Sequence, residues 1–134
     1  MNSISTTRAD EIIRRACVRA EAIGMAACVA VVDAGAHLKA FRRMDGAFAG
    51  AVDVSQRKAR TSALFPLPSG AFGQVIAEQQ LTGMELTNGG LAAFHGGLPI
   101  MDGEILLGAV GVSGGSAEQD LEVARYALGQ DGPQ

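Results

Sequence analysis

The residue pair Asp102-Gly103 constrains the fold of this chain more strongly than any other feature. It separates two apolar segments, residues 98–101 and 105–112, and an Asp-Gly pair in that setting is the strongest short-range signal for a two-residue β-hairpin. Such a hairpin makes the two segments antiparallel neighbours in one sheet. The C-terminal half of the chain is therefore predicted to form antiparallel β-structure rather than alternating β-α units with a parallel sheet.

A second hairpin is predicted in the N-terminal half. Residues 26–32 form a continuous apolar run, residues 33–36 have the composition of a turn, and residues 37–43 alternate loosely between apolar and polar. A further short strand is predicted at residues 91–94, before the Asp-Gly hairpin. The sheet is thus expected to contain five strands.

Helices are predicted around these strands, because apolar residues recur there at helical spacing. Ser116 begins the last helix and has Gln119 three residues later, which is the pattern of a capping box. Thr7 is the predicted N-cap of the first helix. The predicted helices cover residues 12–23, 49–65 and 116–128, with a weaker helical stretch at 72–80 in a connector.

The predicted main elements follow one another in the order α-β-β-α-β-β-β-α. This order, with its tight hairpins, indicates an α+β fold in which helices flank a mostly antiparallel sheet. The chain has 134 residues, 48% of them hydrophobic, which is enough for one core but not for two. Residues 1–134 are therefore predicted to form a single domain.

Charge and composition exclude several function classes. The chain has 11 Lys and Arg against 14 Asp and Glu, a formal net charge of −3, and no Trp. It therefore lacks both the basic surface and the aromatic platforms typical of nucleic-acid binding. Charged residues interrupt every apolar run before it reaches the length of about 18 residues that a membrane span needs, so no membrane association is expected.

The N-terminal residues and the cysteines suggest a reducing compartment. Residues 1–10 are polar and lack the basic-then-apolar order of a secretory signal, so a cytoplasmic location is expected. Cys17 and Cys28 lie in apolar patterns and form no disulfide framework, so both are predicted to be buried, reduced thiols.

A glycine-rich segment, residues 108–116, runs from a predicted strand into a capped helix. Backbone N–H groups at such a junction favour an anion, which makes Gly111, Ser113 and Gly114 candidate ligand-binding residues. The spacing matches neither the dinucleotide-binding nor the Walker motif. The alternative is that the glycines only allow strand and helix to pack closely.

Two cationic residues, Arg43 and Lys58, are candidate partners for a ligand carboxylate. Arg43 lies beside Asp45 at a strand-to-helix junction, where a guanidinium can clamp a carboxylate. The alternative is that Arg43 and Asp45 tie down a loop. Lys58 is one of only two lysines in the chain, and a lone lysine on a surface helix is most often solvated.

Neither histidine belongs to a metal-binding motif, so a structural zinc site is not expected. His37 follows a predicted turn and is expected at the surface. His95 lies among glycines that leave its ring free to face a pocket, which makes it a candidate haem ligand or general base. Met44, Met84 and Met101 are expected to be core residues rather than axial ligands.

Five motifs, in this order along the chain, resemble those of the GlcG/HbpS family, which is related to the C-terminal domain of PduO-type proteins. The resemblance spans roughly residues 12–128. It implies a profilin-like fold with a five-stranded antiparallel sheet and symmetric oligomers, often octamers. Some members bind haem and others are described as haem-degrading or redox-sensing accessory proteins. The motifs are residues 31–35, 43–47, 55–61, 96–100 and 108–120.

One departure from the family concerns haem. Haem-binding relatives can use a histidine from the N-terminal helix, whereas residues 4–24 of this chain contain none. Ligation of the haem iron would then require His95 or a side chain from a neighbouring subunit.

Three hypotheses follow for the function. The first is an oligomeric accessory protein that binds a small ligand carrying a carboxylate, with haem as a possible cofactor, through Arg43, Asp33, Lys58 and the glycine-rich segment. The second is a small catabolic hydrolase, deaminase or isomerase acting on an unsaturated carboxylic acid, with Lys58, His95 and Asp45 as catalytic residues. In the third, the motifs only build the sheet and the subunit interfaces.

Overall fold

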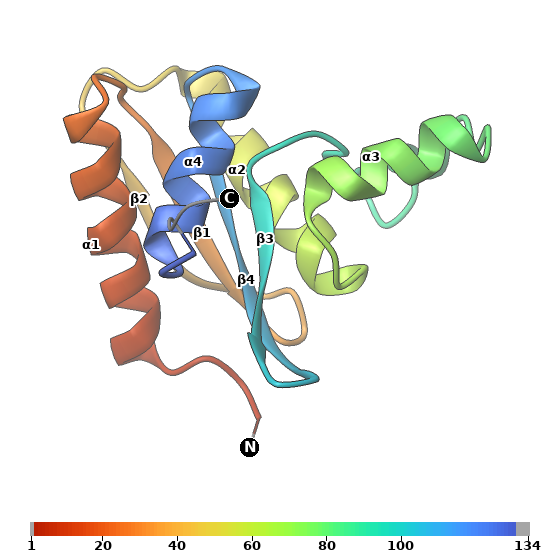
Figure 1. The fold of residues 1–134 in the computed structure, drawn as a ribbon, viewed down its shortest axis with the longest axis horizontal. Helices are drawn as coiled ribbons and strands as arrows, with labels where there is room; N and C mark the ends of the chain where they lie inside the picture. Colours follow the sequence, from red (N-terminus) through yellow and green to blue (C-terminus); the bar gives the residue numbers. More distant parts are fainter. Residues whose placement is uncertain (1, 131–134) are drawn as a thin grey trace.

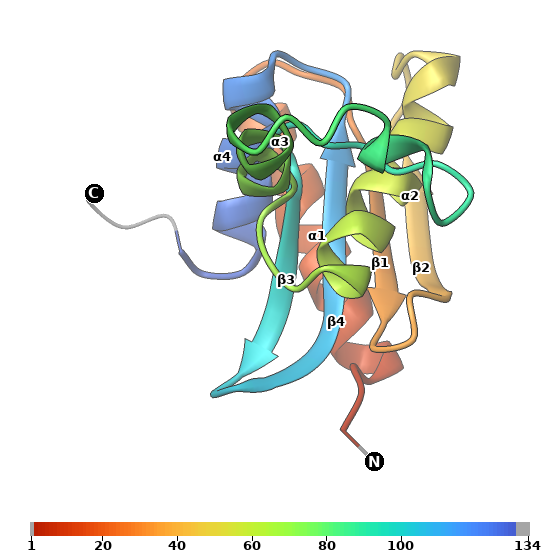
Figure 2. The same cartoon turned by 90° about the vertical axis from the view of Figure 1, so that its right-hand side faces the viewer.

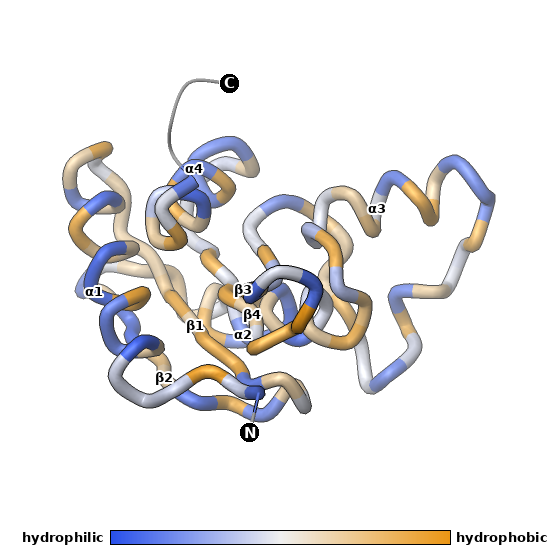
Figure 3. The backbone as a smooth tube through the Cα atoms, turned by 60° about the horizontal axis from the view of Figure 1, so that its bottom comes forward, coloured by the Kyte–Doolittle hydropathy of each residue, from blue (hydrophilic) through white to orange (hydrophobic). Residues whose placement is uncertain are grey.

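Four antiparallel strands form one sheet, with the strand order β2-β1-β4-β3, in a computed structural model that describes residues 2–130. The central strands β1 and β4 carry the longest apolar runs, and Figure 3 shows hydrophobic residues concentrated along β1. The elements are α1 (Thr6–Ala22), β1 (Cys28–Asp33), β2 (Leu38–Arg43), α2 (Ala49–Leu64), α3 (Ser69–Glu78), the 3₁₀-helix η1 (Met84–Leu86), β3 (Gly97–Asp102), β4 (Ile105–Ser113) and α4 (Ala117–Ala127).

Helices cover both faces of this sheet. α1 and α4 pack side by side on one face, and α2 covers the other (Figures 1 and 2). The face under α1 and α4 is filled by branched residues such as Ile12, Val31 and Val110. The face under α2 is lined mainly by small residues such as Ala30 and Ala109, so α2 lies close to the sheet.

Glycine permits this close approach at one position in particular. A Cβ on Gly111 of β4 would collide with the backbone carbonyl of Ser55 in α2. The alternation of side chains along β4 therefore leaves room for the α2 backbone only because this position is glycine.

Most of the predicted elements are confirmed. Both hairpins form, and Gly103 has a positive φ of 61° in the turn between β3 and β4. The weak helical stretch corresponds to α3, and α4 has the predicted capping box between Ser116 and Gln119. The cap of α1 is Ser5 rather than Thr7, because the Ser5 hydroxyl accepts the Arg8 N–H.

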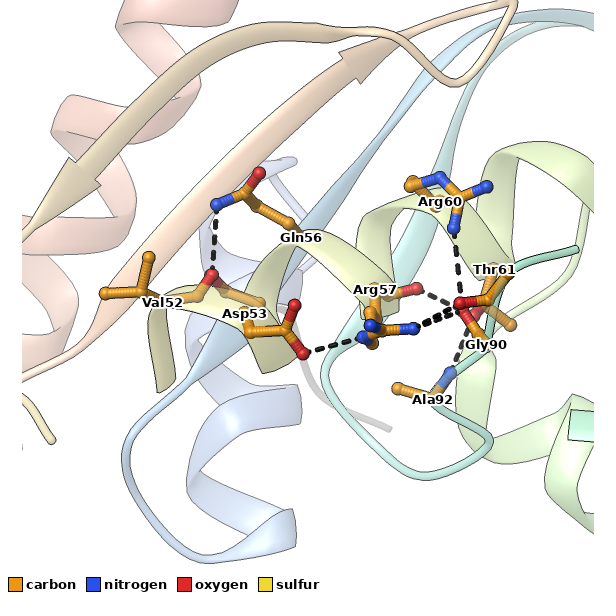
Figure 4. Close-up of polar contacts among 10 residues, drawn as sticks. Val52, Asp53, Gln56, Arg57, Arg60, Thr61, Gly90 and Ala92 are labelled. Atoms are coloured by element: carbon orange, nitrogen blue, oxygen red, sulfur yellow. Dashed lines mark hydrogen bonds and ion pairs between the residues drawn. The ribbon is translucent and has the colours of Figure 1, made fainter. Parts of the chain in front are cut away.

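The fifth strand, predicted at residues 91–94, is wrong. Side chains of α2, rather than another strand, bind the backbone of residues 89–92 (Figure 4). The Ala92 N–H donates to the Thr61 hydroxyl at 3.0 Å, and Arg57 donates to the carbonyls of Gly89 and Gly90. Because α2 side chains satisfy these backbone N–H and carbonyl groups, the segment does not need to pair with a neighbouring strand. The order of elements is therefore α-β-β-α-α-β-β-α, around a four-stranded sheet.

None of the helices in residues 2–130 is both long and apolar enough to span a membrane.

Candidate functional site

Lys58 is the most unusual polar residue of the interior. Its side chain, on α2, is only 1% exposed, so it is not the solvated lysine typical of a surface helix. The Nζ ammonium donates to the Val112 carbonyl and to Asp120 Oδ2, both at 2.9 Å, and lies 5.1 Å from the centroid of the Phe94 ring. Lys58 thus joins α2 to β4 and α4 through an ion pair and a cation–π contact.

Burial and pairing act on this ion pair in opposite directions. Burial lowers the pKa of Lys58 and raises the pKa of Asp120, because each charged form loses its hydration. Their mutual hydrogen bond and attraction oppose both shifts. Neither group is therefore held as firmly in its charged form as the same residue in water.

The glycine-rich segment binds a carboxylate of the chain itself. The Gly115 N–H donates to Asp120 Oδ1 at 2.9 Å, and the Ser116 N–H donates to Gln119 Oε1 at 2.9 Å. Gly114 passes so close to the Ala26 carbonyl that a Cβ there would collide with it. The predicted anion-binding N–H group at Gly115 thus binds Asp120 of the chain itself. Gly111 and Gly114 allow close contacts with neighbouring backbone.

Arg43 and Asp45 lie near the junction of β2 and α2, as expected, but Arg43 serves the loop. Its guanidinium donates to the Ala47 carbonyl at 3.0 Å. Asp33 lies elsewhere: Arg43 pairs with Cys28 at the start of β1, whereas Asp33 is the last residue of that strand. The structure therefore does not bring Asp33 and Arg43 together.

Asp33 organises the hairpin turn. Its Oδ1 accepts the N–H groups of Gly35 and His37, each at 2.9 Å. The His37 N–H is the main reason that the pKa of Asp33 is lowered. The His37 side chain is exposed, as predicted.

His95 is exposed and lines a cavity of about 290 Å³ between α3 and the start of α4. The ring lies against α3 so closely that a Cβ on Gly70 would collide with it. Phe94 lines the same cavity and contacts Lys58, so it is a shared neighbour of His95 and Lys58, whereas Arg43 and Asp45 do not line this cavity. The other residues around this cavity are Gly73, Gln74, Ala77, Ala93 and Ala117.

A second, larger concavity lies where the end of α1 meets the end of β2. Its volume is about 610 Å³, and its lining includes three sulfur-containing residues, Cys17, Met25 and Met44. Arg42 and Asp45 provide charge at its margin. We call this concavity the sulfur groove; its remaining residues are Glu21, Gly24 and Ala26.

The sulfur groove is not apparent in the sequence. Its sulfur residues come from separate segments in no motif spacing, and Cys17 and Met44 look like ordinary core residues in their own patterns. Cys17 is in fact only half-buried. Burial raises the pKa of its thiol, and the guanidinium of Arg42 acts against that shift.

No cluster of three or more His, Cys, Asp or Glu residues suited to a metal ion occurs within residues 2–130.

A family model described as "Haem degrading protein HbpS-like" matches residues 4–129. The chain belongs to the HbpS-like family. This assignment confirms the family resemblance that the five sequence motifs indicate.

Relatives of this HbpS-like chain match it along nearly its whole length. A 15.0 kDa protein of Citrobacter freundii, encoded between dhaT and dhaS, is 35% identical over 130 residues, which cover 94% of this chain and 90% of that protein. The crystal structure of Klebsiella pneumoniae protein ORFY has a TM-score of 0.92 and 33% identity, and the match covers 98% and 92% of the two chains. The crystal structure of a PduOC:haem complex has a TM-score of 0.82 and 26% identity over 96% of this chain and 94% of that one.

Proposed function

We propose that this HbpS-like protein is a small-ligand-binding accessory protein and that its ligand is haem, held in the sulfur groove. The observation that carries the proposal is the convergence of Cys17, Met25 and Met44 on one concavity with Arg42 at its edge. A structurally similar relative, PduOC, has been crystallised as a haem complex.

The size and chemistry of the sulfur groove suit this ligand. Pockets for organic ligands of drug size or larger typically enclose about 300–1,000 Å³, and about 610 Å³ lies well inside that range. Haem iron accepts thiolate and thioether sulfur as axial ligands. The cavity beside His95, at about 290 Å³, is at the lower limit and suits a smaller molecule.

Each residue of the groove would have a different role in binding haem. Cys17 would offer the iron a thiol and Met44 a thioether, whose sulfur accepts the Ala27 N–H at 3.3 Å in this structure, and Arg42 would offer a guanidinium to a propionate carboxylate. Burial raises the pKa of the Cys17 thiol, and Arg42 partly offsets that rise in favour of the thiolate, which is the form that binds metal. Bound haem would supply one-electron or oxygen chemistry.

A haemin titration of the purified apo-protein, followed by the Soret absorbance, tests the proposal. We expect a saturable shift in the wild type and an affinity at least about tenfold weaker in the double variant C17A/M44L, since each lost ligand removes well over 1 kcal/mol. The matched control C28A/M101L removes the same residue types outside the groove and should bind like the wild type. A flat wild-type titration would exclude haem as the ligand.

The variant H95A separates the two candidate iron ligands. Unchanged binding in H95A supports ligation within the sulfur groove. Loss of binding in H95A, with normal binding in C17A/M44L, would contradict the groove and favour His95 as the haem ligand.

We further propose that the protein acts in the cytoplasm as a homo-oligomer. A reducing compartment would preserve the thiol of Cys17. α3 and the turn after it project from the body (Figure 1), and Leu86 in this projection is 77% exposed. An apolar projection of this kind is suited to pack against a second copy of the chain.

A further inference from the structure

Lys58 has an environment that the haem proposal does not use. Its ammonium has two hydrogen-bond partners, the Val112 carbonyl and Asp120, and it also lies against the ring of Phe94 and the backbone of Gly96. Phe94 is 52% exposed although it covers a buried charge. Phe94 thus contacts the amine and also lines the cavity beside His95.

The backbone around Phe94 is fixed on both sides, whereas about half of the residue is exposed to solvent. On the N-terminal side, Arg57, Arg60 and Thr61 of α2 hold residues 88–92 (Figure 4). On the C-terminal side, the Gly97 N–H donates to the Ser69 hydroxyl at 2.8 Å and the Gly96 carbonyl accepts the Val112 N–H at 2.9 Å. Exposed side chains rotate within nanoseconds, so movement of the Phe94 ring is the route by which a small molecule from the cavity would approach Lys58.

We propose that Lys58 is a nucleophilic amine that forms an imine with a small aldehyde or ketone entering the cavity beside Phe94. The Nζ lone pair attacks the carbonyl carbon, and the carbonyl oxygen takes up a proton to give a carbinolamine. The C–O bond then breaks, the oxygen leaves as water and a C=N bond forms. The overall change is amine plus carbonyl compound to imine plus water.

Asp120 is placed to move the protons of this reaction. Its Oδ2 lies 2.9 Å from Nζ, so the carboxyl group can deliver a proton to the departing hydroxyl and accept one from the nitrogen. The Gly115 N–H holds the other oxygen at 2.9 Å and so fixes the orientation of the carboxyl group. A protonated imine would keep the positive charge that pairs with Asp120.

The surroundings of Lys58 favour this chemistry over that of an ordinary surface lysine. Burial favours the neutral amine, which is the nucleophilic form, and desolvated lysines are the usual imine-forming residues of enzymes. One helical turn further along α2, the Ser62 hydroxyl is buried and has no hydrogen-bond partner among residues 2–130. The cavity volume of about 290 Å³ limits the substrate to a small molecule.

The chain provides its own control, because its only other lysine is the exposed Lys39. The protein is incubated with propanal or pyruvate, any imine is reduced with cyanoborohydride, and the modified lysines are identified by peptide mass mapping. We expect Lys58 to be labelled at least about tenfold faster than Lys39, despite its burial. Labelling of Lys58 no faster than that of Lys39, with both probes, would overturn the proposal.

Two variants test the role of Phe94 without altering the ion pair. F94A should increase the labelling of Lys58 severalfold and leave Lys39 unchanged. The matched control F48A, which truncates another exposed phenylalanine, should leave both rates unchanged. A lower rate at Lys58 in F94A would contradict the path proposed here. Because wild-type labelling is the primary readout, the test does not depend on a Lys58 variant that folds, and it is independent of haem binding.

Discussion

Single residues in this protein matter most where a charge is buried. Lys58 and Asp120 are 62 positions apart, yet their side chains, 1% and 5% exposed, form an ion pair in which each charge has only one further hydrogen-bond partner, the Val112 carbonyl or the Gly115 N–H. Removal of either partner leaves the other charge without compensation in the interior. Substitution of either residue therefore measures how much this ion pair between α2 and α4 contributes to the stability of the fold.

The variant K58M should lower the free energy of unfolding by about 3–5 kcal/mol at neutral pH, as expected when one partner of a buried ion pair is removed. The loss should be smaller in mild acid, because the isolated Asp120 can then take up a proton and become neutral. Urea denaturation at the two pH values measures both effects. K39M, at the exposed lysine, should change stability by less than about 0.5 kcal/mol. Equal stabilities of K58M and K39M would show that the ion pair contributes nothing.

At the scale of the element, the contact of α2 with the sheet depends on small residues. Alanines line the sheet under α2, and the α2 backbone reaches β4 at Gly111. Helix and sheet are consequently closer than larger side chains would allow. The helix position also determines where Lys58 enters the interior, so packing at Gly111 and the geometry of the ion pair are linked.

The variant G111A should destabilise the protein by about 1–3 kcal/mol, because the added methyl group meets the Ser55 carbonyl and α2 must move. G50A is the matched control: Gly50 lies in the first turn of the same helix, with nothing within 4 Å of an added Cβ. There alanine should stabilise α2 by up to about 1 kcal/mol. Thermal denaturation distinguishes the two signs, and a neutral G111A would contradict the proposed close contact.

At the scale of the whole molecule, the body and the projection formed by α3 have different surfaces. The sheet buries the main core with α1 and α4 and a second cluster with α2, whereas α3 and the following turn extend away from these helices (Figure 1). Leu81 and Leu86 are exposed along this extension. An isolated chain would present these apolar side chains to water.

We expect the wild type to form an oligomer in solution and L86E to reduce its mass, because a buried carboxylate at a subunit contact is costly. Size-exclusion chromatography with light scattering measures the mass directly. I105E places the same charge on another exposed apolar residue, in β4, and should leave the mass unchanged. A monomeric wild type would refute self-association through this projection.

The amino-acid sequence by itself determined the elements whose signals are local. The Asp102-Gly103 turn, the apolar run of β1 and the capping box of α4 each act within a few residues, so they predict the hairpins and helices correctly. The family motifs can also be identified from the sequence alone, because they are defined by the order of their residues. The same local reasoning fails at residues 91–94, which have strand-like composition but no neighbouring strand.

Only the tertiary structure decided which distant side chains meet. Residues 88–92 are bound by Arg57, Arg60 and Thr61, and this contact replaces the predicted fifth strand. The ion pair of Lys58 with Asp120 and the sulfur groove likewise join segments that no spacing rule connects. The physical reason is that burial and pairing depend on the packing of whole elements, whereas turns, caps and amphipathic faces depend on neighbours along the chain.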